Sequence, residues 1–397
     1  MKVLINITAA LLFLTGGVCH AQNNAGYQYD SLKISLLTCS SFEKIYALYG
    51  HTAIRIQDTR SGVDVAVNYG LFSFEKPFFA LRFVFGLTDY EMGLESYDDL
   101  YRKYKHYRCS IIQQELDLTD DEKEAILTAM AINYMPENRV YRYNYFYDNC
   151  TTRARDMIVN HINGTVVYGD EDFSGPPFRD IVHSCNAHRP WARFGNDLLL
   201  GFEADVSTSR DEYQFLPANL MNDFNDAVVI TSDGRQRPLV KKTSIALQPG
   251  VQAKVNEFPL RPRVCAIVLL IITIILTVAE CLTRRKYYIY DALLMLVCGL
   301  AGIILFAMLF SHHPTVRLNL QLLLLNPLPL FFIWRMIKTT RRHKVDRQYA
   351  MWTVLIVLFL IGCFMQNYAE GMIFLALSLL IRNLSRLADN RLLKQKR

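Results

Sequence analysis

The fold is divided by an apolar run at residues 264–281, which reads VCAIVLLIITIILTVAEC. A transmembrane helix needs about 17–25 predominantly apolar residues, and this run satisfies that requirement. The basic cluster Arg284–Lys286 follows almost directly. The run therefore predicts a membrane-spanning helix that ends at a positively charged loop.

Working outward toward the C-terminus, further apolar segments predict an all-α membrane domain at residues 264–384. About five transmembrane helices are expected, at approximately 264–282, 288–310, 319–337, 350–366 and 371–384, followed by a basic tail at 385–397. If all five cross, Arg284–Lys286, Lys338–Lys344 and the tail share one side, and basic loops mark the cytoplasmic side. The residues before 264 are then expected outside.

The N-terminus supports the same orientation. Residues 1–21 are typical of a signal peptide, with Lys2, the apolar run Val3–Leu14 and small residues ending at Ala21. Cys19 makes the cleavage site weak, so an uncleaved N-terminal anchor is the alternative. The formal net charge of +6 comes from basic residues beside the apolar segments, and we therefore expect no nucleic-acid partner.

The expected exported region divides into a core at residues 22–165 and a remainder at 166–255. Strands are expected at 31–39, 52–56 and 64–69, the last two joined by a turn at Arg60–Gly62. Thr119 and Glu122 form a capping box that predicts a helix running to about Tyr134. A second helix is expected to begin near Cys150, capped by Asp148 or Asn149. The mixture predicts an α+β domain.

Cys150 and His51 are the candidate catalytic pair. A thiol at a helix start gains thiolate character from the free N–H groups and the helix dipole, and a nearby histidine can act as its base. Asn68, on the second strand of the hairpin, is a candidate to orient the imidazole. The alternatives are a buried structural thiol, a strand-edge histidine and a turn asparagine.

The remaining exported cysteines predict neither a definite disulfide pairing nor a metal site. Cys39, Cys109 and Cys185 allow at most one disulfide among them if Cys150 is catalytic. There is no CxxC spacing, glycine-rich phosphate loop or His/Cys cluster, so we expect no metal and no cofactor. His312 and His313, with Asn319 nearby, are candidates for binding lipid headgroups between the second and third spans, and the alternative is an ordinary interfacial loop.

The motifs Tyr49-Gly50-His51-Thr52-Ala53-Ile54, Val67-Asn68-Tyr69-Gly70 and Tyr147-Asp148-Asn149-Cys150-Thr151 resemble the Bacteroides-type lipoprotein N-acyltransferases, the Lnb family. The order of His and Cys also resembles circularly permuted papain-like enzymes of the NlpC and lecithin:retinol acyltransferase kind. The resemblance implies a permuted papain-like core at 22–165 in the periplasm, anchored in a bacterial inner membrane with a cytoplasmic C-terminus. It also implies that Cys150 is the nucleophile, His51 the base and Asn68 the third member.

The expected reaction follows from this location. Outside the inner membrane an acyl donor must arrive already activated, and a phospholipid ester is abundant. We expect the acyl group to pass through a Cys150 thioester to the α-amine of a diacylglyceryl-cysteine on a lipoprotein, an acceptor supplied by the resemblance. Candidate substrate-binding residues are Asn149, Arg55, His312, His313 and Asn319.

Two other function classes stay open. The first is a periplasmic hydrolase, in which the same pair cleaves a peptidoglycan peptide or deacylates a lipid. The second is a non-catalytic membrane assembly protein. The oligomeric state, the preferred headgroup and acyl position, and the role of residues 166–255 are not predicted.

Overall fold

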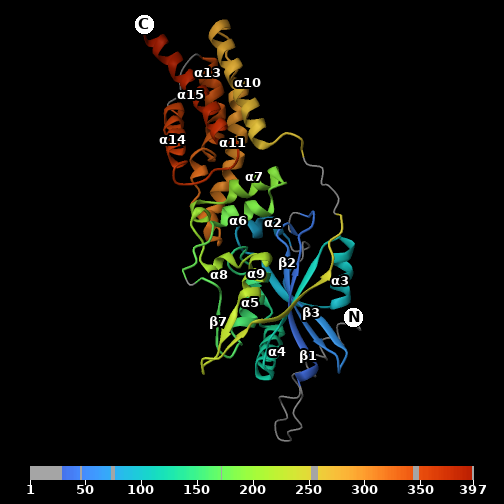
Figure 1. Cartoon of the computed structure of the whole chain (residues 1–397). Coiled ribbons are helices and arrows are strands. Elements are labelled where there is room, and N and C mark those ends of the chain that lie inside the picture. Colours follow the sequence, from blue (N-terminus) through green and yellow to red (C-terminus); the bar gives the residue numbers. More distant parts are fainter. Residues whose placement is uncertain are drawn as a thin grey trace. The chain divides into compact units, whose positions relative to one another are not determined.

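The computed structural model describes residues 29–44, 47–72, 77–170, 172–251, 258–342 and 348–395. The predicted signal peptide, 1–21, lies outside the described residues. The chain forms two compact units, which we call the sheet unit (residues up to Pro176, and Ser207–Val255) and the helical unit (Pro177–Val206, and Asn256 onward). The first is a sheet-rich α+β domain, and the second is helical (Figure 1).

The sheet unit is built on a seven-stranded antiparallel sheet with the order β10-β5-β1-β2-β3-β4-β6. Its strands are β1 Leu32–Cys39, β2 His51–Asp58, β3 Val63–Leu71, β4 Asp89–Ser96, β5 Ile111–Leu116, β6 Val140–Arg142 and β10 Val240–Leu247. A small second sheet contains β7 Thr165–Val167, β8 Val228–Ile230 and β9 Gln236–Pro238. The helical elements are η1 Tyr29–Ser31, α2 Phe79–Val84, α3 Tyr97–His106, α4 Asp120–Tyr134, α5 Cys150–Val159, α8 Arg210–Tyr213 and α9 Pro217–Asp226.

Local sequence signals account for several of these elements. The hairpin of β2 and β3 turns where predicted, and the Asp58 carboxylate accepts hydrogen bonds from the N–H groups of Arg60 and Ser61. Helix α4 has the predicted capping box, in which Thr119 and Glu122 each accept from the other's backbone N–H. The prediction of strand, hairpin and helix at these positions is confirmed.

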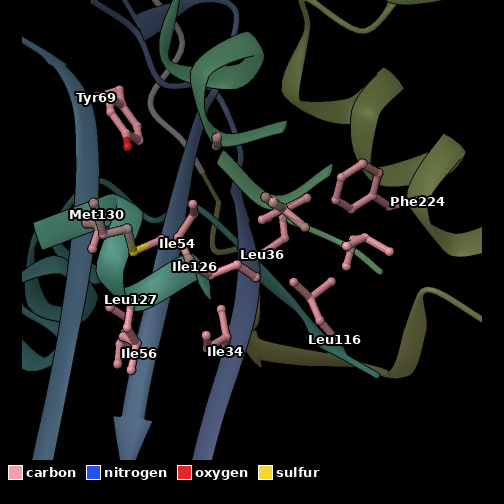
Figure 2. Packing of buried hydrophobic residues seen from close by; sticks show 14 of the residues in the cluster. Ile34, Leu36, Ile54, Ile56, Tyr69, Leu116, Ile126, Leu127, Met130 and Phe224 are labelled. Carbon is pink, nitrogen blue, oxygen red and sulfur yellow. The ribbon is translucent and has the colours of Figure 1, made fainter. Parts of the chain in front are cut away.

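Both faces of the large sheet are covered. The alternation of side chains along a strand sends Ile54 and Ile56 of β2 to one face, where they join a core that includes α4, α5 and α9. Figure 2 shows Ile126 and Leu127 of α4 facing this strand. The opposite face packs Leu37, Ala53 and Ala66 against α3. Fully burying one large aliphatic side chain contributes about 1.5–3 kcal/mol, so this layered core holds the strand ends in place.

The helical unit contains the predicted apolar segments. Its α-helices after residue 257 are α10 Pro262–Thr283, α11 Tyr288–Met308, α12 Pro314–Arg317, α13 Leu328–Arg341, α14 Gln348–Gly362 and α15 Met372–Gln395, with a 3₁₀ turn, η4 Leu320–Leu323, after α12. Among the described residues, three stretches are long and apolar enough to cross a membrane: Pro262–Thr283, Tyr288–Met308 and Pro314–Arg341. The expected count of five is not established by these helices.

Two of the predicted segments differ in detail from the structure. The third, 319–337, is not one continuous α-helix, because η4 occupies its start and α13 begins only after Pro327. Proline lacks an N–H and favours the first turn of a helix, so the motif Asn326-Pro327 starts a new helix. The fifth, 371–384, continues in α15 to Gln395 and takes in most of the predicted tail.

Residues 177–206, which the sequence grouped with the rest of the exported region, cluster with the helical unit. They form α6 Phe178–Cys185, α7 Pro190–Leu199 and η3 Phe202–Asp205. The N–H groups of Gly201 and Phe202 donate to the carbonyls of Thr315 and Leu318 at 2.8 and 2.7 Å. The region 166–255 is therefore divided between the two units.

A buried arginine organises this segment. Arg179 is 1% exposed, and its guanidinium contacts the carboxylates of Asp205 and Asp197 at 2.7 and 3.1 Å. Asp205 in turn accepts a hydrogen bond of 3.0 Å from the Asn367 amide. Because each buried charge has a charged or polar partner, the segment can pack tightly without an isolated ion.

Candidate functional site

Cys150 is the first residue of α5, and Asn149 before it caps the helix. The Asn149 Oδ1 accepts from the N–H groups of Thr151 and Thr152 at 2.8 and 3.0 Å. Its Nδ2 donates to the carbonyls of Tyr145 and Phe215. The amide of Asn149 is therefore fully used in holding the helix start. Among the hydrogen bonds of the described residues, none takes up the Cys150 N–H.

His51 is the first residue of β2, and Gly50 makes its position possible. The strand register places His51 opposite Cys39 of β1. Gly50 has a φ of +78°, and a Cβ at this position would lie 2.8 Å from the Cys39 carbonyl oxygen. Only glycine meets both conditions at low cost, so the motif Gly50-His51 enters the strand by a path that other residues would obstruct.

Asn68 joins His51 across the hairpin. The His51 Nε2 lies 2.8 Å from the Asn68 Oδ1, and the Asn68 Nδ2 donates to the Glu95 carboxylate at 2.8 Å. A carboxylate accepts only, so it selects the amide nitrogen and leaves the amide oxygen to face the imidazole. His51 therefore donates through Nε2, and Nδ1 is the ring nitrogen left for the thiol.

The thiol and the imidazole change each other's acidity. Burial alone raises the pKa of Cys150, but the charge of His51 and a hydrogen bond from it, together with the Thr52 N–H and the Thr151 hydroxyl, outweigh burial and lower that pKa. Burial likewise lowers the pKa of His51, but the Cys150 charge and hydrogen bonds to Cys150 and Asn68 outweigh it and raise the pKa. Both directions favour a thiolate beside an imidazolium.

Hydroxyl groups and aromatic rings surround this pair. The hydroxyls of Thr52 and Thr151 lie 3.1 Å apart, which links the start of β2 to the start of α5. Burial and the Cys150 charge raise the pKa of Tyr143 well above its ordinary value. Cys150 and His51 are only partly exposed and Asn68 is 2% exposed. The arrangement can therefore support attack by sulfur on an acyl carbonyl.

Two residues of the site, Glu95 and Thr52, were not predicted from the sequence. Glu95 lies on β4, and its hydrogen bond to Asn68 depends on the pairing of β3 with β4. No local pattern announces such a contact, because a strand register is a long-range property. Thr52 directly follows His51 in the sequence. This position beside a candidate base was the one signal that could have identified Thr52.

Arg55 and Asn149 have other partners than a substrate. The Arg55 guanidinium binds the Asp64 carboxylate through two hydrogen bonds of 2.7 and 2.6 Å, donates to Gln113, and lies 3.4 Å above the Tyr97 ring. These contacts occupy most of its donors. Asn149 is likewise occupied as the cap of α5. Both side chains therefore help to position parts of the sheet unit, and their substrate-binding role stays a prediction.

His312, His313 and Asn319 belong to the helical unit, whereas Cys150 belongs to the sheet unit. His312 is exposed, whereas His313 is 9% exposed. The Asn319 amide donates to the Leu198 carbonyl at 2.9 Å and accepts from Gln366. Asn319 therefore helps to hold the segment 177–206 inside its unit. Contact of His312, His313 and Asn319 with lipid headgroups stays a prediction.

Cys39, Cys109 and Cys185 form no disulfide bond within the described part of the chain. Cys39 and Cys109 are buried beside α3, where burial raises the pKa of Cys39 far above its ordinary value. The residues that the structure describes contain no group of three or more His, Cys, Asp or Glu side chains able to hold a metal ion.

Comparison with known families adds two matches. The family model described as the Lnb N-terminal periplasmic domain matches residues 20–182, and the one described as the Lnb transmembrane domain matches residues 253–393. Both Cys150 and His51 lie inside the first match. A search of the curated proteins and a search of the solved structures each found no match.

Proposed function

The chain belongs to the Lnb family as a membrane protein with a periplasmic N-terminal domain, and from this premise we propose that it is a lipoprotein N-acyltransferase. It moves an acyl chain from a membrane phospholipid to the α-amine of the diacylglyceryl-cysteine of a bacterial lipoprotein. The family match supports a protein that modifies lipoproteins, and the chemistry below rests on the side chains around Cys150.

The observation that carries the proposal is the contact between Cys150 at the start of α5 and an imidazole that Asn68 orients. Cysteine hydrolases and acyltransferases need a thiolate, a base and a group that fixes the base. Here Cys150 is the nucleophile, His51 the base and Asn68 the orienting residue. The helix that bears the cysteine follows the strands that bear the other two, which supports a circularly permuted papain-like core.

The first half-reaction transfers the acyl group to the enzyme. The Cys150 thiolate attacks the ester carbonyl of a phospholipid, so that an S–C bond forms and the carbonyl oxygen becomes an oxyanion. When the oxyanion collapses, the C–O bond of the ester breaks. The His51 imidazolium gives its proton to the leaving alcohol, and a lysophospholipid departs.

The second half-reaction transfers the acyl group to the lipoprotein. The α-amine attacks the thioester carbonyl while His51 accepts one of its protons. The C–S bond then breaks, which yields an amide and regenerates the Cys150 thiolate. A thioester retains enough reactivity for an amine to take the acyl group. Both substrates are anchored in a bilayer, which explains why a catalytic domain is joined to a membrane domain.

The topology is part of the proposal. The sheet unit lies in the periplasm, five segments cross the inner membrane, and the C-terminus is cytoplasmic. The basic clusters Arg284–Lys286 and Lys338–Lys344 and the basic residues of α15 support this orientation. The apolar helix α14 is shorter than the three clear candidates, so it crosses only with help from its flanking residues.

Mass spectrometry of lipoprotein N-termini tests the proposed reaction. A strain that lacks this protein should accumulate diacylated lipoproteins with a free α-amine, and the wild-type gene should restore the third acyl chain. Cys150→Ala should fail to restore it, although the protein is produced at a normal level.

Two outcomes would contradict the proposal. If the lipoprotein amines are acylated in the deletion strain, the protein is a hydrolase or has another substrate. If Cys150→Ala restores acylation in full, the protein assists assembly without catalysis. Cys185→Ala is the matched control, because it removes a partly exposed thiol of the helical unit and should restore acylation completely.

A further inference from the structure

The proposed reaction also requires groups that stabilise the negative charge on a carbonyl oxygen. In each half-reaction a carbonyl oxygen becomes negative, and acyl transfer needs hydrogen-bond donors aimed at that oxygen. The Cys150 N–H at the start of α5 is one such donor. A single backbone donor is usually joined by a second group, and such a group has to lie close to Cys150.

Tyr141 carries a buried hydroxyl that could serve as the second donor. It lies on β6, where it pairs with Tyr90 of β4, and it is 7% exposed. Its hydroxyl oxygen is fully buried and has no hydrogen-bond partner among the described residues. Buried polar atoms in folded proteins are nearly always hydrogen-bonded, so an unpartnered hydroxyl requires an explanation.

Gly70 shows how close this hydroxyl is to the nucleophile. A Cβ placed on Gly70 would lie 3.7 Å from the Tyr141 hydroxyl oxygen and 3.8 Å from the Cys150 Cβ. The hydroxyl and the cysteine therefore flank the same point in space. Because residue 70 is glycine, with a φ of +84°, no side chain fills that point.

The ring of Tyr141 is held in place by charge. The Arg153 guanidinium lies 3.5 Å from the centre of the ring, and the Asp148 carboxylate holds Arg153 through two hydrogen bonds of 2.6 and 2.9 Å. This stack fixes the ring plane. Asp148 and Arg153 belong to the segment around Cys150, so the loop that presents the nucleophile also positions the tyrosine.

Tyr141 keeps its proton and is therefore a donor. Burial, and then the charge of Cys150, raise the pKa of Tyr141 far above its ordinary value, although Arg153 acts in the opposite direction. The groups that lower the pKa of the thiol are His51, Thr52 and Thr151. Tyr141 is not among them, so its hydroxyl is available for another acceptor.

We propose that the Tyr141 hydroxyl and the Cys150 N–H together form the oxyanion hole of this protein. Tyr141 donates one hydrogen bond to the oxyanion that forms when the S–C bond is made, and it donates again when the amine attacks the thioester. It remains protonated throughout, and all proton transfers go through His51. The inference rests on the proposed acyl chemistry, but not on the identity of the acceptor.

The test uses the full-length protein in detergent with p-nitrophenyl octanoate, an activated ester that reports acylation of Cys150 directly. Tyr141→Phe should lower kcat for p-nitrophenol release by about 10²-fold or more, which is the usual effect of removing one oxyanion donor. Alkylation of Cys150 by iodoacetamide forms no oxyanion. Its rate and pH profile should therefore stay within twofold of the wild type.

Tyr69→Phe is the matched control. The Tyr69 hydroxyl is also buried and unpartnered among the described residues, but the charge of Cys150 is not among the influences on its pKa. Removing this hydroxyl should change neither ester cleavage nor alkylation. Both substitutions remove an unpartnered buried group, so neither should lower the melting temperature.

Several results would overturn the inference. One is that Tyr141→Phe cleaves the ester within twofold of the wild-type rate, and another is that ester cleavage and alkylation fall in parallel. In the first case the hydroxyl does not contribute to ester cleavage, and in the second it affects the reactivity of the thiol and not the oxyanion. A variant that loses its native circular dichroism would mean that the hydroxyl holds the fold, and this too is contrary to the inference.

Failure of the proposed function gives a different pattern. One result is that the wild-type protein cleaves the ester through Cys150 and Tyr141→Phe is impaired, while lipoprotein amines stay free in the presence of the wild-type protein. The proposed acceptor is then wrong, and the assignment of the oxyanion hole is retained. If the wild-type protein forms no acyl-enzyme at Cys150, both proposals fall.

Discussion

The sheet unit and the helical unit each enclose a cluster of polar groups, and the two clusters differ in the kind of group that they contain and in its exposure. The thiol cluster of the sheet unit consists of Cys150, His51 and Asn68. The charge cluster of the helical unit consists of Glu280, Asp291, Arg382 and Arg386. Both lie among apolar side chains, but His51 and Cys150 are partly exposed, whereas all four members of the charge cluster are buried.

The charge cluster ties three helices together. Arg382 on α15 contacts Asp291 of α11 at 2.6 Å and Glu280 of α10 at 2.9 Å. Arg386, one turn later, contacts the same two carboxylates. All four side chains are at most 5% exposed, and two positive charges meet two negative ones. Such neutral, shared pairing fixes the register of the helices.

The thiol cluster has a different organisation. His51 is held on one side by Asn68 and faces Cys150 on the other, while the Cys150 N–H remains untaken among the described residues. The cluster is also partly exposed at His51 and Cys150. A reactive cysteine needs a partly exposed environment, whereas ion pairs that hold helices together can be fully buried. The predictions below test this contrast.

The largest effect is expected from His51→Ala. The loss of the base should lower acyl transfer by about 10²–10⁴-fold, while the melting temperature stays close to that of the wild type. The rate of p-nitrophenyl ester cleavage and a thermal unfolding curve measure the two quantities. His161→Ala is the control, because that histidine lies in the same unit and its imidazole is 2.9 Å from the Met157 carbonyl, on the helix α5. A variant that loses stability but keeps its rate would show that His51 is structural.

The next effect concerns stability and comes from Arg382→Leu. Removing one member of a buried ion pair leaves charges without compensation and costs about 3–5 kcal/mol, so the helical unit should unfold at a clearly lower temperature in detergent. Arg285→Leu removes an exposed arginine and should change stability by no more than about 0.5 kcal/mol. If Arg382→Leu melts like the wild type, the charge cluster does not hold the helices.

The smallest effect is a shift in pH dependence. Because the pKa of Cys150 is lowered, its thiolate persists below the pH at which an ordinary thiol is protonated, and it is lost as the pH falls through the lowered value. The iodoacetamide reaction should therefore remain fast at neutral pH. In His51→Ala, burial acts without the opposing imidazolium, so the alkylation curve should move to higher pH. Coincident curves for the two proteins would refute the thiolate–imidazolium pair.

Much of the local structure could be predicted. The capping box at Thr119 and the hairpin turn at Gly62 depend on residues three or four positions apart, and both occur as expected. Helix α5 starts at Cys150 for the same local reason, because Asn149 caps it. The apolar runs predicted α10 and α11 by length and composition alone. Each of these features is decided within a few residues of chain.

Other features had no local signal. Arg55 was expected at a substrate, but its partner Asp64 lies on the neighbouring strand and becomes visible only with the register of the hairpin. The contact from Glu95 to Asn68 has the same origin. The helices of residues 177–206 gave no sequence sign of joining the helical unit, because their attachment depends on backbone contacts with a region far along the chain.

By itself, the sequence determined which segments are helices, strands, turns and apolar spans, and it presented Cys150 at a helix start and His51 at a strand start. These outcomes follow from capping, periodicity and hydrophobic length, which act over short distances along the chain. Only the tertiary structure decided that Cys150, His51 and Asn68 meet, that Glu95 fixes the amide, and that the Tyr141 hydroxyl lies beside the nucleophile. Strand register and packing bring these groups together, and both are set by the whole core and not by neighbours in sequence.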